Sequence, residues 1–180
     1  MKMIYPKIQI WFILVLLSLG FAACQQRKER SEKPQSIDTA QVYDEQADAR
    51  LDINHAIDRA GMTNKKILLI FGANWCSWCK SLHHLFETDQ EIRQYLKQHF
   101  EVVLIDVGRR DKNMDLSGKY GNPVDNGLPV IVVLDSAGNY LATQETGALE
   151  LPPSQEHKYG HDRTKVLNFL RHWGETIQAT

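Results

Sequence analysis

Two short stretches of the chain are almost wholly apolar, and a helical pattern lies between them. Residues 65–71 and residues 101–107 each form an apolar run that is typical of a buried strand. Apolar side chains recur at helical spacing within residues 81–87, and a Thr-x-x-Glu capping box at residues 88–91 predicts a second helical segment. A strand, a helical region and a strand in this order predict a parallel pair with a right-handed crossover.

Similar patterns predict the elements on either side of this unit. Residues 45–61 have apolar positions at about helical spacing, and their final glycine is expected to be the C-cap. Residues 130–144 consist of two apolar runs around a turn and predict a β-hairpin. The tail predicts an amphipathic helix, capped by Asp162 or Thr164, that covers one face of the sheet. Residues 108–126 are predicted to be irregular.

The first residues of the chain carry the pattern of a signal peptide. A short basic segment, residues 1–7, precedes residues 8–21, which are almost all apolar. This apolar stretch is shorter than the roughly 20 residues that span a bilayer, and it ends in the small pair Ala22 and Ala23. We therefore expect residues 1–23 to be removed on export.

The segment after the signal is polar and charged, with scarcely an apolar side chain over residues 24–44. Such a composition cannot bury enough surface to fold, so this segment is predicted to be a disordered tether. The remaining residues, 45–180, are sufficient for one folded domain.

Composition and charge narrow the classes of function. The 180 residues carry a formal net charge of −1, a balance that gives no indication of a nucleic-acid partner. Of the three cysteines, Cys24 belongs to the signal, while Cys76 and Cys79 form a Cys-x-x-Cys motif. An exported chain without further cysteines has no structural disulfide framework, which favours a working role for this pair.

Cys76 and Cys79 stand where the first buried strand gives way to a helix. Cys76 is expected at or just before the first helical turn, where free N–H groups and the positive end of the helix dipole stabilise an anion. A thiol in that position loses its proton more readily than an ordinary cysteine, and the thiolate is the nucleophile. Cys79, three residues on, is expected on the same helix face. The pair therefore has the chemistry of a dithiol that cycles between reduced and oxidised forms.

Residues 75–80, Trp-Cys-Ser-Trp-Cys-Lys, resemble the active site of the thioredoxin superfamily. Residues 127–130, Gly-Leu-Pro-Val, resemble a second landmark of that family, a proline ahead of a buried strand. The resemblance covers residues 45–180 and implies an α/β fold, a thioredoxin-like three-layer sandwich. It also implies a central mixed β-sheet flanked by helices, an extra N-terminal helix, and a cis Pro129 that faces the dithiol.

The resemblance implies thiol–disulfide exchange with protein substrates. Cys76 attacks a substrate disulfide, and the more buried Cys79 then attacks Cys76 and releases the reduced substrate. Trp75 is expected to shield the dithiol, and the backbone of Leu128 and Pro129 to pair with the extended chain of the substrate. The reducing direction is favoured over the oxidising one, with an unidentified thiol as the electron donor.

The chain departs from the family pattern near the cysteines. Thioredoxins carry a buried acid six residues before the first cysteine, where it accepts the proton of the resolving cysteine, whereas this chain has Ile70. Ser77 and Trp78 replace Gly-Pro between the cysteines, so the redox potential and the substrate range do not follow from the resemblance. His83 is interpreted as a partly exposed helix residue without a catalytic task.

Because a cysteine follows the small pair at the end of the signal, residues 22–24 resemble the cleavage site of a bacterial lipoprotein. The resemblance implies that Cys24 is lipidated and anchors the domain in the cell envelope, facing the periplasm. Gln25 in place of an aspartate favours the outer membrane. Phe21 departs from the preferred leucine, and an ordinary secretory signal or an uncleaved anchor is the alternative.

Two alternative functions stay open. One is a copper(I) carrier with a thioredoxin fold, since two thiolates suit Cu(I), and the other is a tethered binding module with an incidental redox pair. A structural zinc site would need four ligands, and the chain has no second cysteine pair. The function that the motifs favour is a monomeric, membrane-tethered thiol–disulfide oxidoreductase without cofactor or bound metal.

Overall fold

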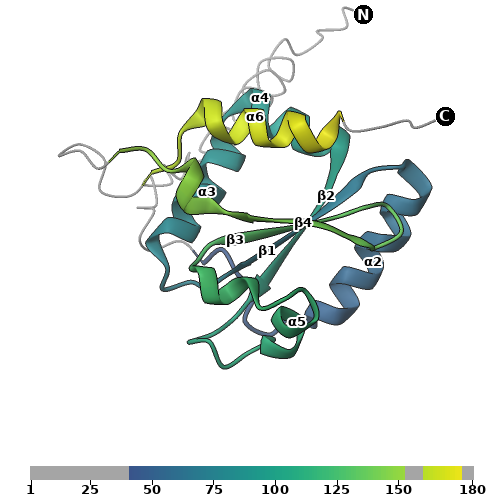
Figure 1. The fold of residues 1–180 in the computed structure, drawn as a ribbon, viewed down its shortest axis with the longest axis vertical. Coiled ribbons are helices and arrows are strands. Elements are labelled where there is room, and N and C mark those ends of the chain that lie inside the picture. The colour runs from purple at the N-terminus through teal and green to yellow at the C-terminus, as the bar shows by residue number, and fades with distance from the viewer. Residues whose placement is uncertain (1–40, 153–159, 176–180) are drawn as a thin grey trace, which may run out of the picture. The chain divides into compact units, whose positions relative to one another are not determined.

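A four-stranded mixed sheet forms the centre of the part of the chain that this computed structural model describes, residues 41–152 and 160–175 (Figure 1). Its strands are β1 (Lys66–Gly72), β2 (Phe100–Asp106), β3 (Val130–Leu134) and β4 (Tyr140–Glu145), in the order β2-β1-β3-β4. β1 pairs in parallel with β2 and antiparallel with β3, and β3 pairs antiparallel with β4. The predicted parallel pair, hairpin and mixed sheet are confirmed.

Helices cover both faces of the sheet and give the three layers that the sequence predicts (Figure 1). One face carries α2 (Ala49–Thr63) and α5 (Met114–Lys119), and the other carries α3 (Ser77–Thr88), α4 (Gln90–His99) and α6 (Arg163–Gly174). The short 3₁₀ turns η2 (Pro123–Asn126) and η3 (Thr146–Leu149) flank the hairpin. The expected N-terminal helix before β1 is α2.

The alternation of side chains along β1 divides them between two cores. Leu69 and Phe71 pack with α2 on one face, whereas Leu68 and Ile70 pack with α3 and α6 on the other. All four are at most 2% exposed. Full burial of such a side chain contributes about 1.5–3 kcal/mol, and a strand covered on both faces is therefore an unbroken apolar run.

α2 begins and ends later than its pattern predicts. The carboxylate of Asp48 caps the N-terminus by accepting two backbone hydrogen bonds, so the helix starts several residues after Glu45. It continues through Gly61 and closes at Asn64, whose φ of 54° is left-handed. Asparagine tolerates this conformation better than other side chains with a Cβ, so the predicted Gly61 C-cap is wrong.

Two further expectations about local structure are wrong. Asp89, not Thr88, caps α4, because its carboxylate accepts the Ile92 N–H at 3.0 Å and carries the negative charge that a helix N-terminus favours. Thr88 ends α3 instead. Residues 108–126 are not wholly irregular but contain α5 and η2. α5 has six residues and few buried positions, which is too short for a periodic pattern to appear in the sequence.

The segments near the two ends of the described chain, residues 41–44 and α6, both pack on the domain. Asp162, one of the two predicted caps, closes the N-terminus of α6 through the Lys165 N–H. Residues 41–44, which the sequence places at the end of the tether, pack on the domain through Tyr43, which is 3% exposed. Cys24 and the predicted signal peptide lie outside the described residues. In the described part, no helix has the length and apolarity needed to cross a bilayer.

Candidate active site

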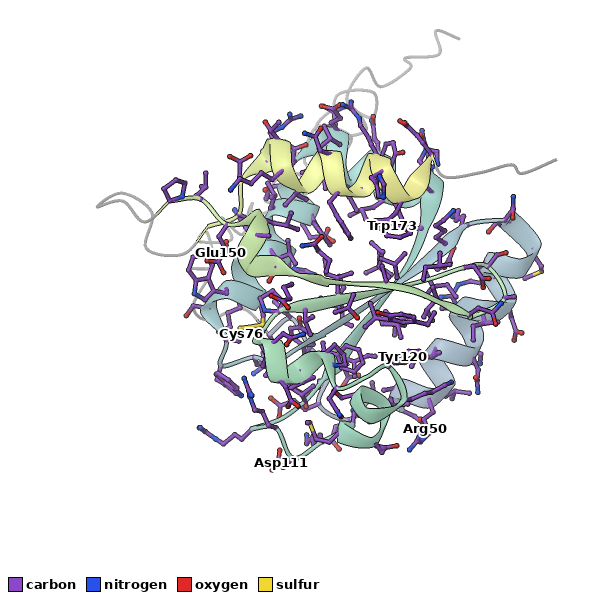
Figure 2. All side chains as sticks on the ribbon, in the orientation of Figure 1. Arg50, Cys76, Asp111, Tyr120, Glu150 and Trp173 are labelled. Atoms are coloured by element: carbon purple, nitrogen blue, oxygen red, sulfur yellow. A yellow bond between two sulfur atoms is a disulfide. The ribbon has the colours of Figure 1, made fainter. Side chains whose placement is uncertain are left out.

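Cys76 and Cys79 form a disulfide at the N-terminal end of α3, at one side of the domain (Figure 2). Cys76 is the N-cap residue, with an extended backbone, and Cys79 lies in the first turn, 5.3 Å away between Cα atoms. Both are buried, Cys76 at 6% and Cys79 at 1% exposure, in the order that the sequence predicts. The strand–helix junction therefore places the pair as expected.

Two backbone groups surround the sulfur of Cys76. The Cys79 N–H donates to Cys76 Sγ at 3.1 Å, which is the N-cap hydrogen bond of the helix. The carbonyl oxygen of Leu128 lies 3.7 Å from the same sulfur. The Leu128–Pro129 peptide bond is cis, as the family resemblance predicts. As a thiolate, this sulfur accepts the hydrogen bond of the Cys79 N–H. As a thiol, it can donate its proton to the carbonyl oxygen of Leu128.

A hollow of about 320 Å³ opens beside Cys76. Its lining consists of Trp75, Cys76, Ser77, Trp78, Arg110 and Leu128. Trp75 is 53% exposed, and its Nε1–H donates to the carbonyl oxygen of Gly108 at 2.6 Å. The indole is thereby held toward the loop after β2, at the rim of the hollow. Two indoles and a leucine give this hollow apolar walls, and one arginine adds a positive charge.

A larger hollow, of about 510 Å³, lies at the opposite end of β1, beside Lys66 and Trp173. Figure 2 shows Trp173 and Cys76 on different sides of the domain. This hollow has no sulfur nucleophile in its lining. The cysteines, rather than the size of a cavity, therefore locate the candidate site.

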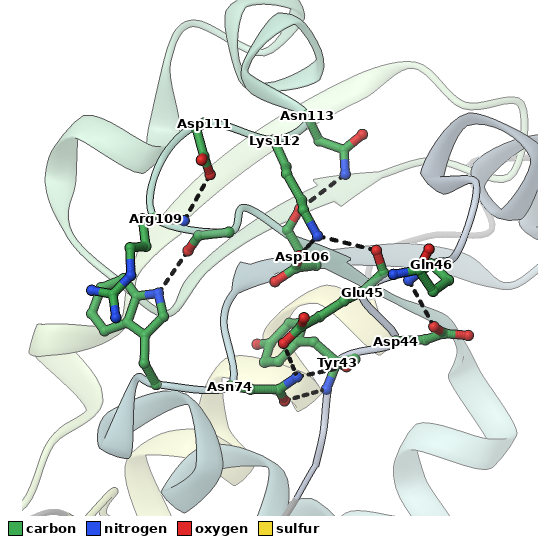
Figure 3. Close-up of polar contacts among 12 residues, drawn as sticks. Tyr43, Asp44, Glu45, Gln46, Asn74, Asp106, Arg109, Asp111, Lys112 and Asn113 are labelled. Atoms are coloured by element: carbon green, nitrogen blue, oxygen red, sulfur yellow. Dashed lines mark hydrogen bonds and ion pairs between the residues drawn. The ribbon is translucent and has the colours of Figure 1, made fainter.

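A segment before α2, residues 41–47, is fastened to the active-site loop by Asn74, and we name it the N-terminal strap (Figure 3). Asn74 Oδ1 accepts hydrogen bonds from the backbone N–H groups of Val42 and Tyr43 at 2.8 and 2.9 Å. Asn74 Nδ2 donates to the carbonyl oxygen of Tyr43 at 2.8 Å. Nothing in the local sequence marks Asn74, because its partners are some thirty residues away and form no local motif.

Tyr43 of the strap packs directly on the two cysteines. A Cβ atom built on Gly72 would come within 3.0 Å of both the Tyr43 hydroxyl and Cys79 Sγ. Glycine at the end of β1 therefore provides the space in which the phenol meets the sulfur. Burial, and to a smaller extent the charge of Asp106, raise the pKa of the Tyr43 hydroxyl well above its ordinary value. The phenol thus stays protonated.

Asp106 ends β2 and is the parallel-register partner of Gly72. Its side chain is 5% exposed, and Lys112 Nζ lies 3.3 Å from Oδ2. Lys112 also donates to the backbone carbonyl of Glu45 at 3.1 Å, so it links the strap to Asp106 (Figure 3). The sequence predicts Asp106 only as part of a buried strand, whereas the structure shows a buried acid near the phenol that packs on the dithiol.

The described surroundings of Ile70 and His83 give neither residue a catalytic partner. Ile70, at the position of the family's buried acid, is 2% exposed in the apolar core. His83 Nε2 lies 4.0 Å from a carboxylate oxygen of Glu87, one turn along α3. Burial lowers the pKa of His83, and Glu87 partly offsets this effect. Among the residues that the structure describes, no three His, Cys, Asp or Glu side chains converge as metal ligands would.

His161 is a buried titratable group near the site that sequence reasoning missed. It is 5% exposed, and its ring stands edge-to-face against Trp78 with 5.8 Å between centroids. Neither ring nitrogen hydrogen-bonds to another described residue. Burial lowers the pKa of His161 to about 4, so the ring is neutral at neutral pH. It follows Gly160 in the segment before α6, and nothing in the local sequence marks it.

The fold and the Cys76–Cys79 pair define the class of this protein, a thioredoxin-fold disulfide oxidoreductase. A family model described as thioredoxin-like matches residues 47–136, half of the chain. The chain therefore belongs to the thioredoxin-like family.

Two relatives support this membership. The crystal structure of a disulphide isomerase from Xylella fastidiosa Temecula1 is 35% identical and superposes with a TM-score of 0.64, covering 74% of this chain and 97% of that one. The thiol:disulfide interchange protein DsbD of Actinobacillus pleuropneumoniae serotype 5b (strain L20) is 33% identical over 87 residues. That match spans 48% of this chain but only 14% of the DsbD protein.

Proposed function

We propose that this protein is a membrane-tethered thiol–disulfide reductase that acts on disulfides of exported proteins through Cys76 and Cys79. The observation that carries the proposal is the position of Cys76 Sγ, which caps α3, accepts the Cys79 N–H at 3.1 Å and borders a hollow. A thiolate at this place is stabilised by the helix N-terminus and can be reached from the hollow. The names of the two relatives, an interchange protein and an isomerase, both describe disulfide chemistry.

The reaction consists of two sulfur exchanges. In the first, the Cys76 thiolate forms a bond to one sulfur of the substrate disulfide, whose S–S bond breaks, and the other substrate sulfur leaves as a thiolate. In the second, Cys79 attacks Cys76, the bond between Cys76 and the substrate breaks, and the second substrate thiolate leaves. The substrate gains two electrons, and the protein is left with the Cys76–Cys79 disulfide that the structure contains.

The surroundings of Cys76 favour the reducing direction. Strong oxidants of this chemistry owe their potential to a highly stabilised thiolate in the reduced form. Here the residues between the cysteines, Ser77 and Trp78, supply no positive charge, and the carbonyl oxygen of Leu128 at 3.7 Å disfavours a negative sulfur. Arg110 lines the hollow from an exposed position, where solvent weakens its effect. The thiolate is therefore stabilised mainly by the helix, and the dithiol remains a good electron donor.

The reduction potential of the Cys76/Cys79 couple tests the direction. Equilibration with glutathione buffers and quantification of the free thiols are expected to give a value near that of thioredoxin, about −270 mV. A value near that of a strong oxidant, about −120 mV, would overturn the reductase proposal and favour an oxidase.

Trapping of the mixed disulfide tests the two roles. Cys79→Ser is expected to accumulate adducts with exported proteins on non-reducing gels, because the attack succeeds and the release fails. Cys76→Ser is expected to trap few adducts, since the buried Cys79 is poorly reached. Equal trapping by both variants would contradict the assignment of Cys76 as the attacking residue.

The tether is the second part of the proposal, and it rests on the apolar run that ends in Ala22, Ala23 and Cys24. Lipidation of Cys24 anchors the domain to a membrane of the cell envelope, and the outer membrane is favoured by Gln25. Cell fractionation of the wild type and Cys24→Ala is the test, and the variant is expected to move from the membrane pellet to the soluble fraction. Retention of the variant in the pellet would show that no lipid on Cys24 holds the protein there.

A further inference from the structure

The resolving cysteine of the proposed exchange needs a group that takes its proton. Cys79 is 1% exposed, and burial disfavours the thiolate form that must attack Cys76. Ile70 of β1 stands at the position where the family carries an acid, and it is 2% exposed in an apolar core. The side chain of Ile70 has no atom that accepts a proton.

The Tyr43 hydroxyl is a polar group that lies close to Cys79. The hydroxyl and Cys79 Sγ both lie within 3.0 Å of the point that a Cβ on Gly72 would occupy, so oxygen and sulfur are neighbours above the same glycine. The strap holds the phenol there through the hydrogen bonds of Asn74 to its backbone. A protonated phenol accepts one proton and gives up another without becoming charged.

Asp106 lies on the same face of the sheet as the Tyr43 hydroxyl. Gly72 and Asp106 are register partners on adjacent parallel strands, and partners in register project to the same face. The Asp106 side chain therefore stands beside the space above Gly72 in which the phenol and the sulfur meet. Figure 3 shows the Tyr43 ring next to Asp106, and, besides the burial of the phenol, the charge of Asp106 raises the pKa of Tyr43.

Asp106 is equipped to accept a proton. Its Oδ2 atom is buried and makes no hydrogen bond to any described residue, while Lys112 Nζ stays at an ion-pair distance of 3.3 Å. The ammonium group of Lys112 balances the charge of the Asp106 carboxylate, while Oδ2 has no hydrogen-bond donor among the described residues. The titratable groups that face this space are Lys112 from the loop after β2, Tyr43 from the strap, and the two cysteines of α3.

We infer that Asp106 is the proton acceptor for Cys79, acting through the hydroxyl of Tyr43. In the disulfide form the Tyr43 hydroxyl is not hydrogen-bonded to Asp106 Oδ2. In the resolving step the hydroxyl turns to Oδ2 and gives its proton to it as the Cys79 S–H proton passes to the Tyr43 oxygen. The Cys79 sulfur forms its bond to Cys76 Sγ, the bond from Cys76 to the substrate breaks, and the electron pair leaves on the substrate sulfur. The acid that thioredoxins carry on the strand before the motif is thus supplied here from β2, with a residue of the N-terminal strap as the link.

A disulfide probe that reports both steps tests this inference on the full chain. Dithiobis(nitrobenzoate) releases one coloured thiolate when Cys76 attacks and a second when Cys79 resolves. Asp106→Asn is expected to leave the first release within about twofold of the wild type and to slow the second by at least about tenfold near neutral pH. The difference between the variant and the wild type in the rate of the second release is expected to shrink as the pH rises, because hydroxide then removes the Cys79 proton. Tyr43→Phe, which keeps the buried ring, is expected to change the second release in the same way.

The outcomes separate this inference from the proposed function, on which it rests. Asp58→Asn, at an exposed position of α2, makes the same change of charge and is expected to alter neither release. If Asp106→Asn and Tyr43→Phe release the second thiolate at the wild-type rate, or slow it equally at every pH, Asp106 is not the proton acceptor and has at most a structural role. If the wild type releases neither thiolate, the proposed disulfide exchange itself is wrong.

Discussion

Asn74 shows how much of the site depends on a single side chain. Its amide holds the strap with three hydrogen bonds to backbone groups, at 2.8 to 2.9 Å, immediately before the residues that carry the dithiol. These contacts are partly buried, so their loss leaves backbone groups without partners in a place that water reaches poorly. The position of Tyr43 over Cys79 follows from this anchor.

Asn74→Ala is therefore expected to lower the free energy of unfolding by about 1–3 kcal/mol. Urea unfolding monitored by tryptophan fluorescence measures the change. Asn54→Ala, an exposed substitution of the same type on α2, serves as the control and is expected to stay within about 0.5 kcal/mol of the wild type. An unchanged unfolding midpoint for Asn74→Ala would show that the strap is held by other contacts.

His161 makes the stability of the domain depend on pH. The imidazole has a pKa of about 4 in the fold and an ordinary value of 6.5. Between these values the unfolded chain binds the proton and the folded chain does not, so stability falls as the pH drops from 6.5 toward 4. Burial also lowers the pKa of His83, which acts in the same direction. Glu150 forms an isolated antiparallel β-bridge with His161, and burial raises its pKa, so it acts in the opposite direction.

His161→Gln removes the largest of these contributions. Urea unfolding at about pH 7 and about pH 4.5 is expected to show that the wild type loses about 2–3 kcal/mol more than the variant on acidification. The contributions of His83 and Glu150 are common to both proteins and cancel. His84→Gln, at an exposed position of α3, should follow the wild type. Equal acid losses in wild type and His161→Gln would mean that the ring takes up its proton in the folded state.

At the scale of elements, β1 and α3 meet in a space that only glycine leaves open. Gly72→Ala is expected to cost about 1–3 kcal/mol, because the new methyl group overlaps the Tyr43 hydroxyl and Cys79 Sγ. In a Tyr43→Ala background one of the two overlaps is gone, so the same substitution should cost less. Unfolding free energies of the four proteins complete the double-mutant cycle. Gly147→Ala, whose Cβ meets nothing within 4 Å, is the control.

The elements that could be predicted from sequence are those whose burial imposes a local pattern. β1 is covered on both faces and must be apolar throughout, and α3 has one buried stripe, so both follow from periodicity. α5 is too short for a stripe. The choice between Thr88 and Asp89 as the cap of α4 is a competition between adjacent good caps, and Asp89 wins with an added ion pair to Arg163 at 2.6 Å.

At the scale of the whole molecule, the site combines residues that are local in sequence with residues that are not. Cys76, Cys79 and the cis Pro129 lie in short motifs, and the sequence alone was enough to single them out. Tyr43 comes to this site from the polar segment before α2, and Asp106 comes to it from the end of β2. Such a juxtaposition depends on strand register and on the packing of the strap, neither of which leaves a periodic trace in the sequence.

The strap therefore belongs to the domain, and removing it tests this view of the whole chain. A chain that starts at residue 41 is expected to match the chain that starts at residue 24 in stability. A chain that starts at residue 48 loses the buried Tyr43 ring, the bonds to Asn74 and the contact of Lys112 with the Glu45 carbonyl. It is expected to be less stable by about 2–4 kcal/mol, and its reduced Cys79 to react faster with iodoacetamide.

Urea unfolding and mass spectrometry of the alkylated cysteines measure the two effects of the truncation. The new amino group at residue 48 places a positive charge at the start of α2, which is itself unfavourable. The chain that starts at residue 24 and carries Tyr43→Ala with Asn74→Ala has no new charge at the start of α2 and frees the strap, so it should reproduce both effects. If that variant keeps the stability and the slow Cys79 alkylation of its parent, the strap does not cover the dithiol in solution, and the relay through Tyr43 loses its geometric basis.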